Sequence, residues 1–382
     1  MKKFLKEAMR SLLYFVARVA PKTNTAVLRG PSSYEDNSIA IYLGLLSRPV
    51  KSIVWVVNDP QILPPIDLGR NVRLVKRGGF LDVYYSVTAR FLFLTYEHYL
   101  RKTPPSQISV NLWHGVPLKA IGKMVGSEGR ADDFLVATSD FTRPIYAKAF
   151  GMHEDQCIIT GQARTDRMFD LDRQALWQRA FPDQPVPEKV YFWLPTFRLT
   201  KHVKEQRDGK AMGNIFNCSD FSEDLFNSHL AENNAVCLVK PHPATPQESL
   251  KNKSNIHYID EAWLIKHRLT LYQLTGAVDC LISDISSIIV DFMLLNRPVI
   301  LLFEDMKEFE GNRGFSLNPI TDYLPAKVAH NFQSFMIELA LVQNGQDPYA
   351  EKRRALKKLF FKYDDANASQ RILDYAFKKL LP

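Results

Sequence analysis

The sequence predicts an α/β protein built from two Rossmann-like halves. Short apolar runs alternate with helix-compatible segments along most of the chain, a pattern typical of βαβ units with a parallel sheet. A proline-rich segment, "FPDQPVPEK" at residues 181–189, separates two such series. The length of 382 residues also favours two domains, because a single hydrophobic core rarely grows that large.

The apolar runs define the expected strands and the domain limits. The first series comprises the runs at residues 25–30, 51–59, 72–76, 91–97, 108–113, 133–139 and 157–161. The second series comprises the runs at residues 190–196, 235–243, 256–260, 278–284 and 298–303. We therefore expect one domain over residues 23–184 and a second over residues 185–365, followed by a C-terminal helix over residues 366–382.

Residues 1–22 predict a basic amphipathic helix. Apolar side chains recur at helical spacing, whereas Lys2, Lys3 and Lys6 lie mostly elsewhere around the helix. The uncharged run "SLLYFVA" is far too short to span a bilayer. Two interpretations stay open: the helix lies on an anionic membrane surface, or it packs on its own domain with solvated lysines.

Composition excludes several classes of protein. The chain is 46% apolar and 24% charged, as soluble globular proteins are. The net charge of +8 favours an anionic partner, but no zinc-finger spacing or RNA-binding motif accompanies it, so we do not expect nucleic acid. The widely spaced Cys157, Cys218, Cys237 and Cys280 predict neither disulfides nor a metal site, and we interpret them as belonging to a reducing, cytosolic compartment.

The segment "NLWHGVPLKAIGK" places Trp113 and His114 at the carboxyl end of a predicted strand. Gly115 permits a tight turn, and Pro117 suits the first turn of a helix. Ligands of α/β proteins bind at the carboxyl ends of strands, so His114 is a candidate for chemistry. The alternative is a histidine that only closes a loop.

Two further segments favour the binding of an anion. In "VKPHP", a strand ends at Lys240 and two prolines hold His242, which would give a phosphate a preorganised donor. In "SDISS", hydroxyls and backbone N–H groups gather between a strand and the start of an apolar helix, as anion sites do. The polar residues of that segment are Ser283, Asp284, Ser286 and Ser287. An ordinary turn and an ordinary helix cap are the alternatives.

Cations follow other predicted strands in both halves. Thr196 and Arg198 follow the first strand of the second half, Arg164 and Asp166 follow the last strand of the first half, and Arg313 follows "PVILLF". Each alone is typical of a solvated loop, but together they place positive charge at successive strand ends.

The sequence predicts no bound metal and no cofactor. The D-x-D motif at residues 170–172 lies in the linker region with no strand immediately before it, so we interpret it as a solvated helix start. No Walker motif and no G-x-G-x-x-G motif is present, which argues against P-loop and dinucleotide enzymes.

Taken together, the segments resemble the CDP-glycerol glycerophosphotransferase family, which includes the teichoic acid primases and polymerases. The matching segments run in the family's order from Trp113 to Phe315: "WHGVPLKAIG", "TGQARTD", "LPTFR", "KPHP", "SDISSIIVDFMLLNRPVI" and "RGF". The resemblance implies a GT-B architecture, in which two Rossmann-like domains face each other across a cleft. It also implies an acceptor role for the first domain and a donor-nucleotide role for the second.

The resemblance implies a reaction and roles for the residues. An acceptor hydroxyl on a lipid-linked or growing glycan would attack the distal phosphorus of a CDP-polyol, and CMP would leave, during synthesis of a teichoic acid or capsule polymer. His114 and His242 are the expected catalytic residues. The expected donor-binding residues are Thr196, Arg198, Lys240, Ser283, Asp284, Ser286, Ser287 and Arg313. The expected acceptor-side or supporting residues are Trp113, Gly115, Lys119, Arg164 and Asp166. We expect the protein at the cytoplasmic face of a bacterial plasma membrane, held by the basic N-terminal helix.

Three alternatives remain at the level of sequence. A bacterial sialyltransferase or polysialyltransferase also uses a histidine-proline motif and a serine pair, with a CMP-sugar donor. A nucleotide-sugar 2-epimerase has a similar fold. A basic module that binds a membrane or nucleic acid would use the charge itself and leave the predicted site without activity.

Overall fold

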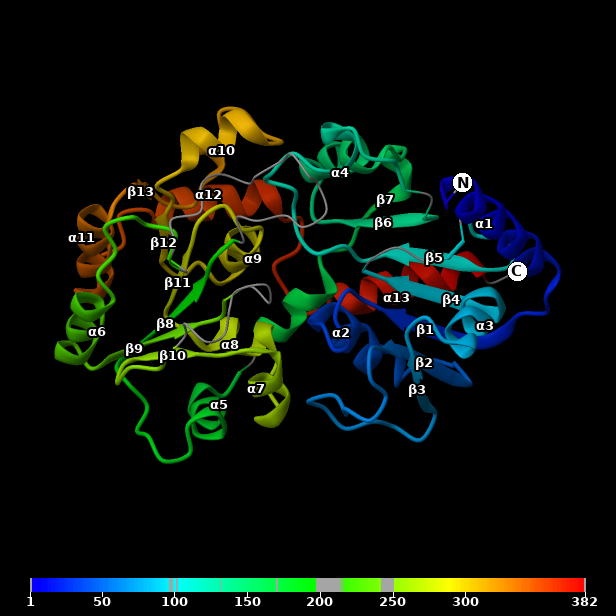
Figure 1. Cartoon of the computed structure of the whole chain (residues 1–382), viewed down its shortest axis with the longest axis horizontal. Helices are drawn as coiled ribbons and strands as arrows, with labels where there is room; N and C mark the ends of the chain where they lie inside the picture. Colours follow the sequence, from blue (N-terminus) through cyan, green and yellow to red (C-terminus); the bar gives the residue numbers. More distant parts are fainter. Residues whose placement is uncertain are drawn as a thin grey trace.

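The computed structural model describes residues 2–95, 99–100, 102–130, 132–169, 171–196, 214, 216–241 and 251–380. This part of the chain forms two parallel β-sheets, one of seven strands and one of six, which lie side by side (Figure 1). The expected α/β class with two Rossmann-like sheets is confirmed. The predicted division at residues 184 and 185 falls between the last strand of the first sheet and the first strand of the second.

The first sheet has the strand order β3-β2-β1-β4-β5-β6-β7, and all neighbours are parallel. Its strands are β1 (Thr23–Arg29), β2 (Ser52–Val57), β3 (Val72–Lys76), β4 (Ala89–Leu94), β5 (Ile108–Asn111), β6 (Phe134–Ala137) and β7 (Cys157–Ile159). The chain order reverses between β1 and β4. Such a switch point is where open α/β sheets bind ligands.

The second sheet has the order β10-β9-β8-β11-β12-β13 and its own switch point between β8 and β11. Its strands are β8 (Lys189–Leu194), β9 (Ala235–Val239), β10 (Ile256–Tyr258), β11 (Cys280–Ser283), β12 (Val299–Leu302) and β13 (Val328–Ala329). All the strands expected from the sequence are present. Only β13 was missed, because two residues are too few to form a recognisable pattern.

Helices connect many of the successive strands, as is usual for parallel connections. Before β8 in the chain they are α1 (Lys2–Val19), α2 (Asp36–Leu45), α3 (Phe80–Thr88), α4 (Thr142–Phe150) and α5 (Arg173–Ala180), of which α5 packs against the second sheet. In the second half they are α6 (Glu223–Glu232), α7 (Glu261–Lys266), α8 (Leu271–Ala277), α9 (Ile288–Phe292), α10 (Met306–Asn312), α11 (Phe332–Gln343), α12 (Ala350–Phe360) and α13 (Ala368–Leu380). The central strands are buried almost throughout, which accounts for their continuous apolar runs.

The last helix returns to the first sheet. Figure 1 shows α12 beside the second sheet and α13, in red, against the first. Ile372, Leu373 and Ala376 of α13 are fully buried in the same core cluster as β1, β2 and β4. The Asp166 carboxylate accepts hydrogen bonds from the backbone N–H groups of Ala368 and Ser369, at 2.9 and 2.8 Å, and so caps this helix.

Helix α1 packs on its own domain and leaves an apolar face exposed. Leu13 and Ala17 pack against Val87 of α3 and against Leu100. The exposed apolar side chains of α1 are Met9, Leu12, Phe15, Val16 and Val19. The interpretation that this helix packs on its own domain is therefore confirmed. Whether its exposed face also contacts a membrane stays open. In the part of the chain that the structure describes, no helix combines the length and apolar character needed to cross a bilayer.

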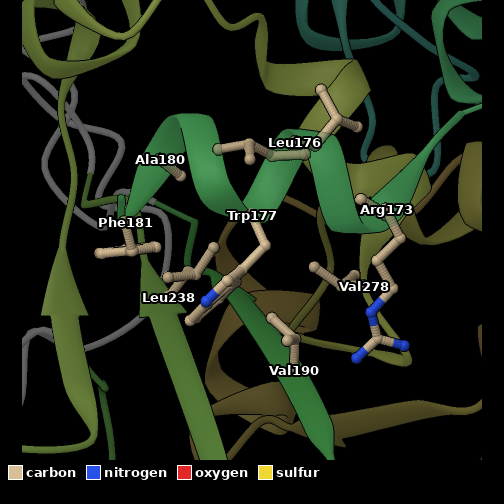
Figure 2. Close-up of a pocket in the computed structure, with 10 residues that line it drawn as sticks. Arg173, Leu176, Trp177, Ala180, Phe181, Val190, Leu238 and Val278 are labelled. Carbon is tan, nitrogen blue, oxygen red and sulfur yellow. The ribbon is translucent and has the colours of Figure 1, made fainter. Parts of the chain in front are cut away.

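A small apolar cavity lies between α5 and the second sheet (Figure 2). Its volume is about 20 Å³, room for about one water molecule. Leu176, Trp177 and Leu238 contribute to its wall, and the one charged lining residue, Arg173, pairs with Asp279 at 2.5 Å. Its size and apolar lining make it a packing gap rather than a site for a charged nucleotide.

Candidate active site

The segment after β5 joins the two domains. Ser287 Oγ donates a hydrogen bond to the His114 carbonyl oxygen at 3.2 Å. Further along, Lys119 pairs with Phe315 in an isolated antiparallel bridge. The prediction that Pro117 begins a helix is wrong: the segment is extended because its backbone bonds to the second domain, and Ser316 Oγ donates to the Pro117 carbonyl.

Gly115 has the positive φ expected of a tight turn, +128°. A Cβ atom at this position would also collide with Ser287 and Arg164. Any other residue would therefore push the second domain away from the His114 turn. The expected turn is confirmed, and the close approach of the other domain is what requires glycine.

His114 is exposed to solvent and rests on the indole of Trp113, with ring centroids 3.8 Å apart. Trp113 has a positive φ of 49°, which is uncommon for a bulky residue. The Arg130 guanidinium lies over the Trp113 ring, and Asn37 Nδ2 donates to the Trp113 carbonyl oxygen at 2.5 Å. Contacts from both sides therefore hold this unusual turn.

The surroundings of His114 keep its imidazole neutral. Loss of hydration among the neighbouring groups, together with the cations Arg164, Arg130 and Lys119, lowers the pKa of His114 from 6.5 to about 3. A neutral imidazole has a free lone pair and can accept a proton at neutral pH. The same cations make the position attractive to an anion.

A buried ion pair connects the domains beside this histidine. Arg164 of the first domain contacts Asp291 of α9 at 2.5 Å, and the Tyr272 hydroxyl donates to the same carboxylate oxygen at 2.6 Å. Asp291 is fully buried and Arg164 nearly so. The Arg164 backbone N–H donates to Asn37 Oδ1 at 3.0 Å, so the arginine is also tied to the Trp113 turn.

The second-domain residues gather at the switch point between β8 and β11. The Thr196 hydroxyl donates to Asp284 at 2.6 Å, which links the ends of the two strands. Ser283 Oγ donates to the Leu194 carbonyl oxygen at 2.6 Å, so this hydroxyl is used within the sheet. Ser286 and Ser287 are partly exposed and precede the short helix α9. The two serines are therefore the accessible hydroxyls of the predicted cluster.

Other predicted residues have assigned contacts or lie outside the described residues. Burial lowers the pKa of Lys240, which directly follows β9. Arg313 Nε donates to the Ala120 carbonyl oxygen at 3.1 Å and so helps to hold the extended segment. Asp172 caps α5, as expected for a helix start. Arg198, His242 and Asp170 lie outside the described residues.

Sequence reasoning missed three residues at this junction. Arg130 lies in a loop with no strand before it, and Asp291 is hidden inside an apolar helix run. Glu35 follows β1, where a search at every strand end would have found it. A charged residue within an apolar helix, such as Asp291, is the signal that a partner must be nearby.

Away from the junction, Cys218, Asp220 and Glu304 bring ligand-type atoms within 4.8 Å of one another. Hydrogen bonds within the protein account for this cluster. Cys218 Sγ donates to Asp220 at 3.1 Å, and the Ser219 N–H and hydroxyl both donate to Glu304 at 2.7 Å. The expectation of no metal stays a prediction.

Comparison with known proteins identifies the family. The family model described as CDP-glycerol:poly(glycerophosphate) glycerophosphotransferase matches residues 12–378. The chain belongs to this family. The match extends far beyond the segments from Trp113 to Phe315 on which the resemblance rested, and it includes α1 in part and most of α13.

Relatives in this family include both glycerol and ribitol enzymes. The chain is 28% identical over 323 residues to teichoic acid ribitol-phosphate polymerase TarK of Staphylococcus aureus, across 79% of this chain and 59% of that protein. It is 25% identical over 369 residues to the teichoic acid glycerol-phosphate transferase of the same species, across 90% of each. The chain thus spans less than two thirds of the length of TarK. It matches 55% of the length of a second ribitol-phosphate polymerase of the same species, TarL.

Solved structures support the fold. Wall teichoic acid polymerase TagF superposes with a TM-score of 0.74 at 23% identity, over 98% of this chain and 93% of that chain. The UDP-GlcNAc 2-epimerase from Neisseria meningitidis superposes with a TM-score of 0.54 at 13% identity, over 93% of this chain and 99% of that chain. The expected GT-B architecture is confirmed, and at these identities the likeness concerns the fold alone.

The buried ion pair should dominate the stability of the junction. Replacing Asp291 with Asn leaves Arg164 buried without its counter-charge, so we expect the free energy of unfolding to fall by about 3–5 kcal/mol. Urea unfolding followed by tryptophan fluorescence measures the change. The exposed pair Arg354–Glu351 provides the control, because Glu351→Gln should leave stability unchanged. Equal stability of the two variants would contradict the role given to Asp291.

The pKa of His114 should respond to a bound diphosphate. In the free protein we expect the imidazole to stay neutral down to about pH 4, because loss of hydration and three nearby cations disfavour its protonation. Binding of CDP adds negative charge beside those cations and should raise the pKa. NMR titration of the histidine rings, with the signal assigned by its loss in His114→Asn, measures both values. A pKa near 6.5 in the free protein would contradict this electrostatic picture.

Proposed function

We propose that this protein transfers a polyol phosphate, with glycerol phosphate the first candidate, from a CDP-polyol to a hydroxyl of a lipid-linked or growing glycan or polyol polymer. CMP is released, and the product is a teichoic acid or capsule-type polymer. The observation that carries the proposal is the neutral His114 among three cations, at the point where the two domains of a glycerophosphotransferase-family chain meet.

The chemistry follows from these groups. The acceptor oxygen forms a bond to the distal phosphorus of the donor, the bond from that phosphorus to the CMP oxygen breaks, and His114 accepts the hydroxyl proton. Negative charge develops on the phosphoryl oxygens during transfer, and fixed cations stabilise it without reorganisation. Arg164 and Lys119 supply such charge from the first domain. No metal or cofactor takes part in this proposal.

The second domain binds the donor in this proposal. Its contribution comes from the switch point between β8 and β11 and from the end of β9. The proposed donor-binding residues are Thr196, Arg198, Lys240, His242, Ser283, Asp284, Ser286, Ser287 and Arg313. Two of them also have structural contacts. Ser283 hydrogen-bonds β11 to β8, and Arg313 hydrogen-bonds to the extended segment after His114.

The first test of the proposed function is a comparison of donors. The purified protein is offered CDP-glycerol, CDP-ribitol, CMP-sialic acid and UDP-GlcNAc in parallel, each with a membrane extract as acceptor. We expect CMP release from a CDP-polyol alone. His114→Ala should lower that turnover at least about a hundredfold, the usual size of a general-base contribution, while CDP still binds.

The outcomes separate the alternatives. Release of CMP only from CMP-sialic acid would favour a sialyltransferase, and conversion of UDP-GlcNAc without an acceptor would favour an epimerase. An H114A variant with near-full activity would remove His114 from the mechanism. Glu351→Gln, which changes an exposed carboxylate on α12, is the control and should retain full activity.

We further propose that the protein works at the inner face of a bacterial plasma membrane, held there by α1 and α3. The outer face of α1 presents Leu12 and Phe15, each 62% exposed, and the neighbouring α3 presents Phe80, 82% exposed. The two helices pack against each other through Ala17 and Val87, and Figure 1 shows both at the same end of the first domain. Exposed apolar side chains next to basic residues suit an anionic lipid surface, and a lipid-linked acceptor resides there.

The membrane proposal predicts that the double variant Leu12→Glu/Phe15→Glu no longer floats with vesicles of anionic phospholipid. Both side chains are exposed, so the fold should tolerate the change, whereas the lipid surface should repel it. The matched control is Ile337→Glu, which alters an exposed apolar residue on α11 of the second domain. Flotation of the double variant at the level of the wild type would reject the role of α1.

A further inference from the structure

Glu35 lies at the switch point of the first sheet, beside the carboxyl ends of β1 and β4. The Thr95 hydroxyl, just past β4, donates to Glu35 Oε1, and the Ser38 hydroxyl donates to the same oxygen at 3.1 Å. Among the described residues, no hydrogen bond reaches the second oxygen, Oε2. The protein therefore orients this carboxyl group through one of its two oxygens.

The backbone at the end of β1 is shaped around this side chain. A Cβ atom at Gly30 would overlap the Glu35 carboxyl group and its Cγ. Glycine at position 30 thus lets the side chain fold back over the strand end and reach Thr95. Glu35 is also only partly buried, so a ligand at the switch point could contact it.

Glu35 is close to the proposed base. β4 is the neighbour of both β1 and β5, so Glu35 and His114 follow strands about 10 Å apart, at roughly 5 Å for each strand spacing. Asn37, two residues beyond Glu35, donates to the carbonyl oxygen of Trp113. The charge of Arg164 acts on the pKa of both Glu35 and His114. The two side chains therefore belong to one region of the first domain.

The chemistry of the two positions differs. Three cations surround His114, which suits the phosphates of the donor. Glu35 offers a carboxyl oxygen, which binds hydroxyl groups and repels phosphate in its ionised form. Burial raises its pKa to about 7, so at neutral pH about half of the molecules carry this carboxyl group in its uncharged form. An uncharged, hydroxyl-rich end group is the ligand that fits it.

We propose that Glu35 binds the acceptor by a hydrogen bond to the hydroxyl that neighbours the attacking hydroxyl of a polyol end group. This inference rests on the proposed function and extends it to the acceptor. Glu35 orients the end group so that the other hydroxyl points to His114, and it takes no part in bond making. A site that pairs with a substrate hydroxyl discriminates strongly against analogues that lack it.

The test uses two acceptors that differ in one hydroxyl. One is an alkyl phosphoglycerol, and the other is the matching alkyl phosphate of propane-1,3-diol, which lacks the neighbouring hydroxyl. We expect Glu35→Met to raise the KM of the glycerol acceptor at least about tenfold, with the KM of the CDP-polyol unchanged. Removal of the hydroxyl from the acceptor should raise KM in the wild type but not further in the variant.

A second variant separates loss of the contact from loss of the fold. Gly30→Ala keeps the Glu35 carboxyl group but displaces it, so it should raise the acceptor KM in the same way. Asp374→Asn is the control, because this carboxylate on α13 is exposed and pairs with Arg48. Affinity for CDP, measured by calorimetry, should be the same in all three variants.

The results distinguish the inference from the function on which it rests. If the wild type uses a CDP-polyol but neither Glu35→Met nor Gly30→Ala changes the acceptor KM, Glu35 does not bind the acceptor and the inference alone fails. The same holds if both acceptors have equal KM values in the wild type. If the wild type releases no CMP from any CDP-polyol, the proposed function is rejected and this inference with it.

Discussion

The contact between Arg164 and Asp291 is the constraint on which the rest of the junction depends. A buried carboxylate without a counter-charge is expensive, so α9 can carry Asp291 in its apolar face only when the first domain supplies Arg164. The Tyr272 hydroxyl completes the arrangement. Because the arginine backbone also bonds to Asn37, the ion pair fixes the Trp113 turn and hence the position of His114.

The same arrangement sets the chemical state of His114. Arg164 cannot lose its proton at physiological pH, so a permanent positive charge of the first domain lies near the imidazole. Arg130, which stacks on Trp113, and Lys119, which lies on the segment bridged to Phe315, add two more. The closed junction therefore favours a neutral base and an anionic ligand together. In the proposed reaction, the negative charge of the donor restores basicity to the ring for proton transfer.

The switch points of the two sheets share one contact but differ in how fully the carboxylate is bonded. Each has a threonine hydroxyl bonded to a carboxylate: Thr95 with Glu35 in the first sheet, and Thr196 with Asp284 in the second. In the second sheet the carboxylate also accepts from the Thr196 backbone and ties β8 to β11. In the first sheet one carboxyl oxygen keeps no bond within the described residues. The proposed division into an acceptor side and a donor side follows this difference.

The sequence by itself determined the architecture, because continuous apolar runs bounded by turns specify buried parallel strands one at a time. It also identified the His114 turn and the serines before α9, since these residues follow predicted strands directly. It could not place Arg130, Asp291 or Glu35, whose importance lies in contacts between segments far apart in the chain. Pro117 was misjudged for the same reason: local preference favoured a helix, but hydrogen bonds to residues of the second domain hold the segment extended. Local patterns determine strands and turns, whereas only tertiary structure decides which charges are brought together and which side chains remain free to meet a substrate.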